Sequence, residues 1–123
     1  MCGIFGVYSK NLEASRLVHS GLWALQHRGQ EGSGIVSSDG RKLHVHRGMG
    51  LVASVYNEEN LLSLPGPIAI GHNRYSTSGG AGCDHLQPVI REDRILALAH
   101  NGNLPTTDKL KLFLTSKGIN TNS

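Results

Sequence analysis

Glycine is the residue that most constrains what this chain can fold into. It accounts for 16 of the 123 residues, whereas an average protein contains roughly 7% glycine. Glycine weakens helices and strands, and it is favoured where the backbone turns sharply or approaches another segment closely. The sequence therefore predicts many tight turns and close backbone contacts within a short chain.

The overall composition is that of one soluble globular domain. Hydrophobic residues make up 38% of the chain and charged residues 17%, which is too apolar for a disordered polyelectrolyte. No run of ~18 apolar residues is present, so no membrane span is expected. Residues 2–8 are apolar but lack a preceding basic segment, so a secretory signal is not predicted and a cytoplasmic location is expected.

The charge distribution argues against a nucleic-acid partner. The formal net charge is +3, from 12 basic and 9 acidic residues, and aromatic residues make up only 5% of the chain. The basic residues are scattered along the sequence, whereas a nucleic-acid-binding surface needs clustered cations. We therefore expect no nucleic-acid binding.

Local patterns predict an α+β chain with mostly antiparallel strands. Strands are predicted from β-branched and alternating runs between turn residues, at 3–9, 35–38, 42–47, 68–74, 87–92 and 94–100. Helices are predicted from apolar residues at three-to-five-residue spacing, from an Asn11 cap to about residue 26, at 57–64 and at 107–117. Asp39-Gly40 is a strong hairpin signal, and Asp93 marks a second hairpin.

Three glycine-rich places are predicted to be loops or breaks. Residues 27–34 are predicted to form a polar loop after the first helix. Gly48 and Gly50 are expected to end the third strand. Residues 76–85 are predicted to form a loop of the domain itself, because ten residues between two strands are more typical of a loop than of a linker.

Cys2 is the first candidate for catalysis. Removal of the initiator methionine, which occurs when the second residue is small, leaves a free α-amine and a thiol on the same residue. An α-amine titrates near ~7.7 to 8.0 and a thiol near ~8.5, so the amine can accept the thiol proton at neutral pH. Hydrolases with an N-terminal Thr use this chemistry. The alternative is a small buried residue at the start of a strand.

Asn101 and Gly102 are the candidate oxyanion hole. They follow an apolar predicted strand, and an asparagine amide and a glycine backbone N–H can converge on one oxygen. The alternative is an ordinary Asn-Gly turn between strands.

Arg74, Thr77 and Arg28 are the candidate substrate-binding residues. Arg74 lies where a predicted strand runs into a loop, and its guanidinium could hold a carboxylate through two parallel hydrogen bonds, which suits an amino-acid substrate. Thr77 and its neighbour Ser76 could donate hydrogen bonds nearby. Arg28 lies in the predicted loop 27–34. Each of them could instead be a solvated surface residue.

Metal binding is the main rival, because the chain has seven histidines. His44 and His46 share one face of a predicted strand, and His72 and His100 lie near strand ends. No HExxH pattern or Cys/His cluster accompanies them. Solvated or core histidines are therefore predicted, with no metal site.

Four segments in a fixed order resemble one family: MCGIFGVY at 1–8, LQHRGQEGSGI at 25–35, GHNRYSTSGG at 71–80 and AHNGNL at 99–104. Together they are similar to the glutaminase domain of the class II, N-terminal nucleophile glutamine amidotransferases. The resemblance covers essentially the whole chain. QHRGQ and RYST are most similar to the branch of this class that delivers ammonia to phosphoribosylpyrophosphate in the first step of de novo purine synthesis.

The resemblance implies a role for each candidate residue. Cys2 would attack the side-chain amide of glutamine and form a thioester, with its own α-amine as the proton carrier. Asn101 and Gly102 would form the oxyanion hole. Three further residues would hold the substrate, with Arg74 on its carboxylate and Thr77 and Arg28 lining the pocket or the loop that closes it.

The resemblance also implies an αββα sandwich of antiparallel sheets, incomplete at the C-terminus. Residues 1–123 would be a partial glutaminase domain, without the phosphoribosyltransferase domain and without the aspartate that, in the family, follows a segment like 118–123 and pairs with the substrate's ammonium. The implied partners are glutamine and the phosphoribosyltransferase domain, in a homo-oligomer when full length. No cofactor is implied in this segment; magnesium is implied in a full-length enzyme, and an iron–sulfur cluster is allowed there.

Two alternatives stay open at this point. The chain could be a truncated, non-catalytic domain that keeps the fold for assembly or regulation. It could also be the glutaminase domain of another class II enzyme, such as a glucosamine-6-phosphate, asparagine or glutamate synthase.

Overall fold

The computed structural model describes residues 1–75 and 83–120. The strands are β1 (Gly3–Tyr8), β2 (Gly32–Ser38), β3 (Leu43–Met49), β4 (Ile68–Arg74), β5 (Val89–Arg91) and β6 (Leu96–Leu98). The helices are α1 (Ala14–Ala24), α2 (Val52–Val55), α3 (Glu58–Leu62) and α4 (Asp108–Ser116). Short 3-10 turns are η1 (Gln26–Arg28), η2 (Cys83–His85) and η3 (Glu92–Arg94).

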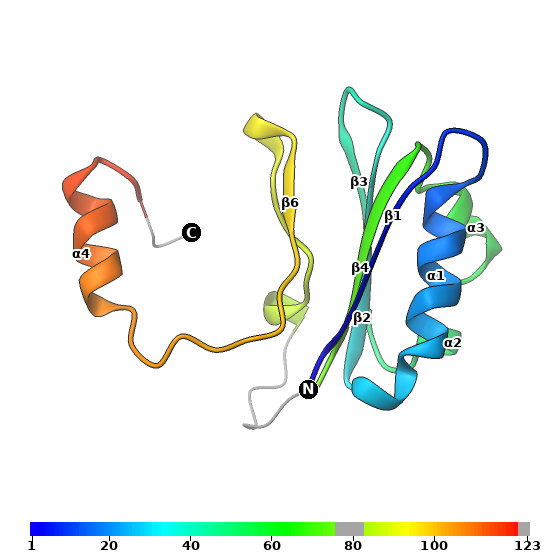
Figure 1. Ribbon diagram of the computed structural model, residues 1–123, viewed down its shortest axis with the longest axis horizontal. Coiled ribbons are helices and arrows are strands. Elements are labelled where there is room, and N and C mark those ends of the chain that lie inside the picture. Colours follow the sequence, from blue (N-terminus) through cyan, green and yellow to red (C-terminus); the bar gives the residue numbers. More distant parts are fainter. Residues whose placement is uncertain (76–82, 121–123) are drawn as a thin grey trace.

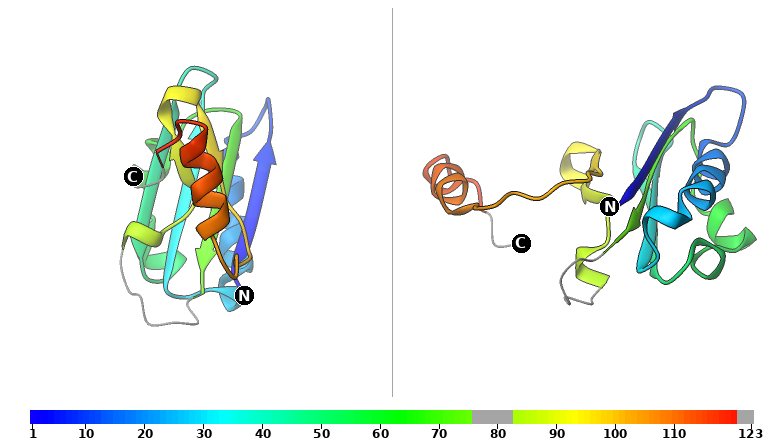
Figure 2. Two further views of the ribbon diagram at one scale, coloured as in Figure 1. Left: turned by 90° about the vertical axis from the view of Figure 1, so that its left-hand side faces the viewer. Right: turned by 60° about the horizontal axis from the view of Figure 1, so that its bottom comes forward.

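These elements form four layers (Figure 1). The larger sheet has the strand order β1-β4-β2-β3 and the smaller sheet pairs β5 with β6, with every pairing antiparallel. Helices α1, α2 and α3 cover one face of the larger sheet, the smaller sheet lies on its other face, and α4 lies beyond the smaller sheet (Figures 1 and 2). The predicted α+β class and the αββα order of layers are confirmed.

The hydrophobic core lies between α1–α3 and the larger sheet. Val18 and Leu22 of α1 and Ile35 of β2 have no exposed surface, and burying each such side chain contributes roughly 1.5–3 kcal/mol. The buried cluster consists of Ala14, Val18, Leu22, Ile35, Val52, Val55, Tyr56, Leu61, Leu64 and Ala69. This core fixes the larger sheet, and with it the strand ends from which candidate site residues project.

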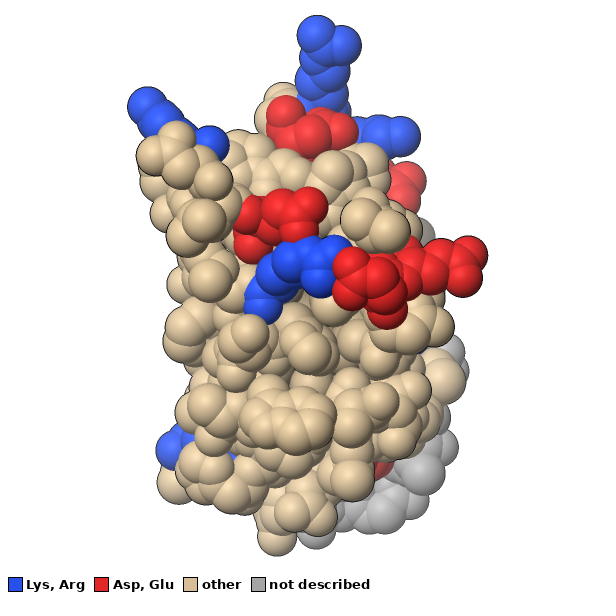
Figure 3. Space-filling model, turned by 90° about the vertical axis from the view of Figure 1, so that its right-hand side faces the viewer, with Lys and Arg blue, Asp and Glu red and all other residues tan. Residues whose placement is uncertain are grey.

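The outer surface of the helical layer carries an ion-pair cluster that joins α1 to α3. Arg16 of α1 pairs with Glu13, just before its own helix, and with Glu58 at the start of α3. Charged side chains gather in the upper part of this face, and uncharged residues fill most of the lower part (Figure 3). The ion pairs are exposed, so they contribute little to the free energy of unfolding.

The predicted loop 27–34 is partly wrong, because β2 begins at Gly32. Glycine has a low strand propensity, but here a close approach requires it. A Cβ on Gly34 would lie 2.1 Å from the Gln87 carbonyl oxygen, so no side chain fits between β2 and the segment that leads into β5.

The predicted break at Gly48 is also wrong. β3 continues to Met49, and Gly48 pairs with Ser33 of β2 in the antiparallel ladder. A Cβ on Gly48 would lie 3.0 Å from Val55 Cγ1, so the missing side chain lets α2 pack against the strand. The segment does turn at Gly50, where φ is +109°, a conformation that glycine adopts without strain.

The first helix begins later than predicted. Asn11 is predicted to cap it, but α1 starts at Ala14 with Glu13 in the N-cap position and without a side-chain cap hydrogen bond. The Leu12 backbone N–H instead donates to Ser9 Oγ at 3.1 Å. A turn therefore precedes the helix where its first residues are predicted.

The other predicted elements agree with the structure. β4 has its predicted range, β1 ends one residue before its predicted end, and α3 and α4 lie within the predicted helices. β5 and β6 lie within the predicted strands 87–92 and 94–100 but are shorter than predicted. The hairpin turn at Asp39-Gly40 is present, with a φ of +90° at Gly40. β5 and β6 form the second hairpin, with η3 at its turn. Of the predicted loop 76–85, residues 76–82 lie outside the described residues, and Cys83–His85 form η2.

The smaller sheet and α4 expose apolar side chains. Leu98 of β6 is 58% exposed and Phe113 of α4 is 57% exposed. None of the α4 residues is buried. Among the described residues, no helix is long and apolar enough to cross a membrane.

Candidate active site

The start of β1 brings Cys2 next to the corner that follows β6. Cys2 directly precedes β1, whose first residue, Gly3, pairs with Asn73 of β4. The backbone nitrogen of Cys2 donates a hydrogen bond to Asn101 Oδ1 at 3.4 Å. Two predicted site residues that are 99 positions apart in the sequence are therefore in contact.

This contact also orients the Asn101 side chain. Because Oδ1 accepts from Cys2, the amide nitrogen Nδ2 points away from that nitrogen and can donate to a different group. Gly102, the next residue, lines the same cavity as Cys2. Asn101 Nδ2 and the Gly102 backbone N–H are therefore the candidate donors to an oxyanion at this corner.

A cavity of about 640 Å³ lies at this corner between the two sheets. Its lining includes Cys2, His72, Arg74, Tyr75, Gln87 and Gly102. Cavities of roughly 300–1,000 Å³ hold small-molecule ligands, so a free amino acid fits easily. Three of the predicted site residues therefore share one cavity.

Arg74 supplies the positive charge of this cavity. It is the last residue of β4, and its Nε pairs with Glu31 Oε2 at 3.4 Å. A Cβ on Gly29 would lie 2.7 Å from the Arg74 carbonyl oxygen, so glycine lets the chain before β2 run directly against the Arg74 backbone.

Arg28 contacts the backbone of the candidate nucleophile. It lies in η1, and its Nε donates to the Cys2 carbonyl oxygen at 3.1 Å. Its Nη2 lies 3.9 Å from Met1 Sδ. With Met1 and Tyr75 it lines a neighbouring cavity of about 250 Å³. The structure thus places Arg28 behind Cys2, outside the larger cavity. Thr77, the remaining predicted substrate-binding residue, lies outside the described residues.

Two residues near the site were not singled out from the sequence. The Tyr75 carbonyl oxygen lies 3.9 Å from Cys2 Sγ, as the acceptor of the thiol proton. Gln26 Nε2 donates to the Gly29 carbonyl at 2.6 Å, and its Oε1 accepts from the Val52 backbone N–H at 2.7 Å. Gln26 thereby ties the segment that carries Arg28 to α2. Its place beside Arg28 in the QHRG motif is the signal that could have identified it.

A buried polar network supports the strand that carries Arg74. Ser33 Oγ donates to Asn73 Oδ1 at 2.9 Å, and Asn73 Nδ2 donates to the Leu22 carbonyl at 2.7 Å. Since the Ser33 proton is used, the Tyr56 hydroxyl is the donor in its 3.0 Å contact with Ser33 Oγ. Burial raises the pKa of Tyr56 above its usual value, which keeps this donor protonated. The network locks β4 to β2 and α1 beside the cavity.

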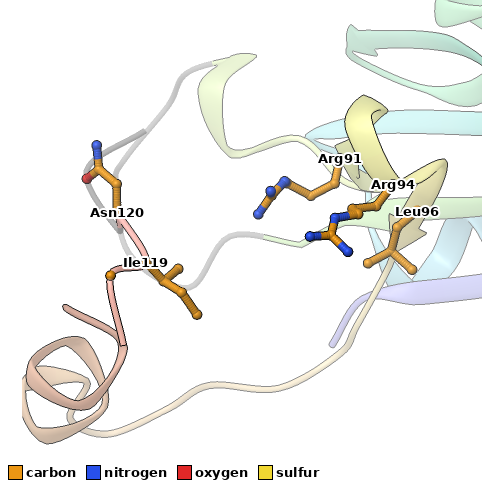
Figure 4. Close-up of a pocket in the computed structure, with 6 residues that line it drawn as sticks. Arg91, Arg94, Leu96, Ile119 and Asn120 are labelled. Atoms are coloured by element: carbon orange, nitrogen blue, oxygen red, sulfur yellow. The ribbon is translucent and has the colours of Figure 1, made fainter. Parts of the chain in front are cut away.

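A second cavity, of about 650 Å³, has a different character. It lies between the β5–β6 hairpin and the segment after α4, and the side chains of Arg91, Arg94 and Leu96 line its hairpin side (Figure 4). Arg91 and Arg94 are exposed, and Arg91 Nη2 pairs with Asp93 at 2.9 Å. Its described lining contains no thiol or hydroxyl, so these residues supply no nucleophile.

The histidines do not gather into a metal site in the described part of the chain. No group of three or more His, Cys, Asp or Glu side chains there is placed to hold a metal ion. Three of the histidines have partners within the protein: His44 bonds to Asp39, and His46 and His72 bond to backbone carbonyl groups. Cys2 and Cys83 are both free thiols.

The chain is similar in sequence to known enzymes over nearly its whole length, although no family model matches it. It is 47% identical over 121 residues to the amidophosphoribosyltransferase of Methanocaldococcus jannaschii, which covers 96% of this chain and 26% of that protein. It is 46% identical over 120 residues to the amidophosphoribosyltransferase of Bacillus subtilis, which covers 95% of this chain and 25% of that protein. The chain thus spans about a quarter of these relatives.

A comparison with solved structures also finds similarity to enzymes of this kind. Glutamine phosphoribosylpyrophosphate amidotransferase from Bacillus subtilis, complexed with ADP and GMP, matches 99% of this chain with a TM-score of 0.80 and 44% identity. A structure described as the allosteric regulatory enzyme of purine biosynthesis matches 99% of the chain with a TM-score of 0.85 and 45% identity. This chain covers 27% of each of them. The chain is therefore a homologue of the amidophosphoribosyltransferases and matches their N-terminal domain, which has the N-terminal nucleophile hydrolase fold.

Proposed function

We propose that this chain is the glutaminase part of an amidophosphoribosyltransferase and that Cys2 is its nucleophile. The observation that carries the proposal is the contact between Cys2 N and Asn101 Oδ1 beside a cavity that Arg74 also lines. Cys2, Arg74 and Gly102 line this cavity and Asn101 contacts Cys2, which supports the assignment of a nucleophile, a carboxylate-binding cation and oxyanion donors to one site.

Removal of Met1 is the first requirement of this reaction. In the structure the Cys2 nitrogen is a peptide nitrogen, and cleavage turns it into a basic amine within reach of the thiol on the same residue. Met1 is 72% exposed, so an aminopeptidase can reach it. Arg28 keeps its hydrogen bond to the Cys2 carbonyl after cleavage, because that carbonyl belongs to the following peptide.

Thioester formation follows from the arrangement of donors. The Cys2 amine accepts the thiol proton while Sγ attacks the side-chain carbonyl carbon of glutamine. Asn101 Nδ2 and the Gly102 backbone N–H donate to the resulting oxyanion. The ammonium then protonates the amide nitrogen, the carbon–nitrogen bond breaks, and ammonia leaves. Water attacks the thioester, the amine accepts its proton, and glutamate departs as the thiol is restored.

The acceptor and the partner domain are inferred from the relatives. The chain matches one region of enzymes that are about four times longer, and those enzymes are named for transferring an amido group to a phosphoribosyl acceptor. We infer that the ammonia formed at Cys2 passes to a phosphoribosyltransferase domain, where it displaces pyrophosphate from phosphoribosylpyrophosphate. All the curated relatives described above carry the amidophosphoribosyltransferase name, which favours this acceptor over those of the other class II enzymes.

Glutamate release from glutamine tests the proposal. Without phosphoribosylpyrophosphate, the intact protein should release glutamate and ammonia in equal amounts. With phosphoribosylpyrophosphate present, the ammonia should be consumed and pyrophosphate should be released in a glutamine-dependent way, in step with glutamate. Asparagine should be hydrolysed at least roughly 10-fold less efficiently, because its side chain is one methylene shorter and the amide no longer reaches Cys2. A folded protein that releases no glutamate would contradict the proposal and favour the non-catalytic alternative.

Replacing Arg74 should weaken substrate binding more than chemistry. In Arg74→Met the KM for glutamine should rise roughly 10- to 100-fold while kcat changes much less, because the hydrogen bonds to a charged carboxylate contribute about 1.5–3 kcal/mol. Steady-state kinetics over a range of glutamine concentrations measures both constants. Arg91→Met, in the second cavity, is the matched control and should keep the KM of the unmodified protein. An unchanged KM in Arg74→Met would remove Arg74 from the substrate site.

A further inference from the structure

His100, the residue that precedes the Asn101-Gly102 corner, is held by side chains on both of its backbone polar groups. The His100 carbonyl oxygen lies 3.2 Å from His72 Nε2. The His100 backbone N–H donates to Gln87 Oε1 at 2.7 Å. Residues 99–104 lie in neither a helix nor a strand, so no regular backbone ladder holds them. We propose that His72 is a positioning residue that sets the geometry of the Asn101-Gly102 corner by fixing the His100 carbonyl.

The position of the His100 carbonyl decides where Asn101 points. This carbonyl belongs to the same planar peptide unit as the Asn101 backbone N–H. Holding the oxygen therefore fixes the plane from which the Asn101 side chain departs toward Cys2 N. A rotation of this peptide would move the Asn101 amide and the Gly102 N–H together, and both are assigned to the oxyanion.

His72 is itself rigidly held. It lies in the middle of β4, is 1% exposed, and pairs with Gly34 of β2 on one side and Ile4 of β1 on the other. Gly34 is also the residue against which the Gln87 backbone packs, with 2.1 Å between a notional Cβ and the Gln87 carbonyl oxygen. The two residues whose side chains hold residue 100 are thus both anchored, through their backbones, at the same part of the larger sheet.

The hydrogen bond from His72 to the His100 carbonyl determines which ring nitrogen of His72 carries a proton. A carbonyl only accepts, so Nε2 must carry a proton. Nδ1 is buried and has no hydrogen-bond partner among the described residues, so a second proton there would be a buried donor without an acceptor. Burial lowers the pKa of His72 and is the largest cause, and the Arg74 guanidinium lowers it further, although the bond to the His100 carbonyl opposes them. His72 therefore acts as a neutral donor.

The inference rests on the proposed function for its catalytic consequence, but its structural part stands by itself. Two variants test it. His72→Leu removes the donor while filling similar space, and His72→Gln keeps an N–H donor that cannot gain a second proton. The matched control is His46→Leu, because His46 Nε2 makes the same kind of bond, to the Val55 carbonyl at 2.8 Å, on β3 and outside the cavity lining.

Two measurements on the intact protein separate the possibilities. Hydrogen–deuterium exchange of the peptide covering 99–104 should be faster in His72→Leu and unchanged in His72→Gln and His46→Leu. Glutamine hydrolysis by His72→Leu should show a kcat roughly 10- to 100-fold lower with a nearly unchanged KM, because a misplaced oxyanion donor weakens the transition state. His72→Gln should restore most of the kcat, and His46→Leu should keep it.

The possible failures are distinguishable. Unchanged exchange at 99–104 in a folded His72→Leu protein would overturn the inference whatever its activity. Faster exchange with an unchanged kcat, or an equal loss of kcat in His46→Leu, would also overturn it. An unmodified protein that does not hydrolyse glutamine would overturn the proposed function, and the exchange measurement would still decide whether His72 holds the corner. Should His72→Leu fail to fold, His72→Met, which also removes the donor to the His100 carbonyl, takes its place with the same expected results.

Discussion

Cys2→Ala is expected to abolish glutamine hydrolysis, with kcat falling by about 10⁴-fold or more. The variant has no atom that can form the thioester, and loss of a nucleophile removes most of the rate enhancement of a covalent mechanism. Binding should survive, since the residues that line the rest of the cavity are unchanged. The measurement is glutamate release at saturating glutamine, together with glutamine binding by calorimetry.

Cys83→Ala is the control for this result. Cys83 is the other free thiol of the chain and it is exposed, so its replacement should leave kcat within about twofold of the unmodified protein, as surface substitutions usually do. Equal activity of Cys2→Ala and the unmodified protein would eliminate Cys2 as the nucleophile. An equal loss of kcat in both variants would show that the loss is not specific to Cys2, which would also contradict its assignment as the nucleophile.

Asn101→Ala is expected to lower kcat by about 10²- to 10³-fold, the usual effect of losing one oxyanion donor. It also removes the acceptor of the Cys2 nitrogen. Asn101→Asp separates these two roles, because aspartate has nearly the same shape and keeps an oxygen for that nitrogen but has no N–H to donate. Its kcat should fall at least as far, since a carboxylate also repels the developing oxyanion.

The rate of glutamine hydrolysis by Asn101→Asp decides between the two roles of Asn101, which are to donate to the oxyanion and to hold the Cys2 nitrogen. If Asn101→Asp hydrolysed glutamine as fast as the unmodified protein, Asn101 would serve only to hold the Cys2 nitrogen, and its assignment to the oxyanion hole would be wrong. The Gly102 backbone N–H would then be the only donor at this corner among the described residues that we assign to the oxyanion.

Local sequence patterns correctly predicted the strands and turns whose backbone conformation is set by residues close in the sequence. β4 has the predicted bounds, and the Asp39-Gly40 turn follows from the left-handed conformation that Gly40 adopts. Patterns failed where a distant segment decides the structure. Gly34 lies inside β2, where the Gln87 backbone leaves no room for a side chain, whereas local propensity alone assigns such a glycine to a loop.

The candidate site was predictable only in part, for the same reason. Cys2, Asn101 and Arg74 were identified by motifs, but no local pattern shows that Cys2 and Asn101 touch. The part played by His72 was missed, because its partner is a backbone carbonyl, which every residue has and which leaves no signature in the sequence. From sequence, His72 is only a solvated or core histidine.

Mass spectrometry of the N-terminal peptide tests the central claim most directly. The intact protein is treated with 6-diazo-5-oxo-L-norleucine, a glutamine-shaped diazoketone that alkylates a nucleophile at the position of the substrate amide. We expect Met1 to be absent and a single adduct to lie on Cys2, with none on the exposed Cys83. A protein that retains Met1, or one that carries the adduct on Cys83 and not on Cys2, would contradict the central claim.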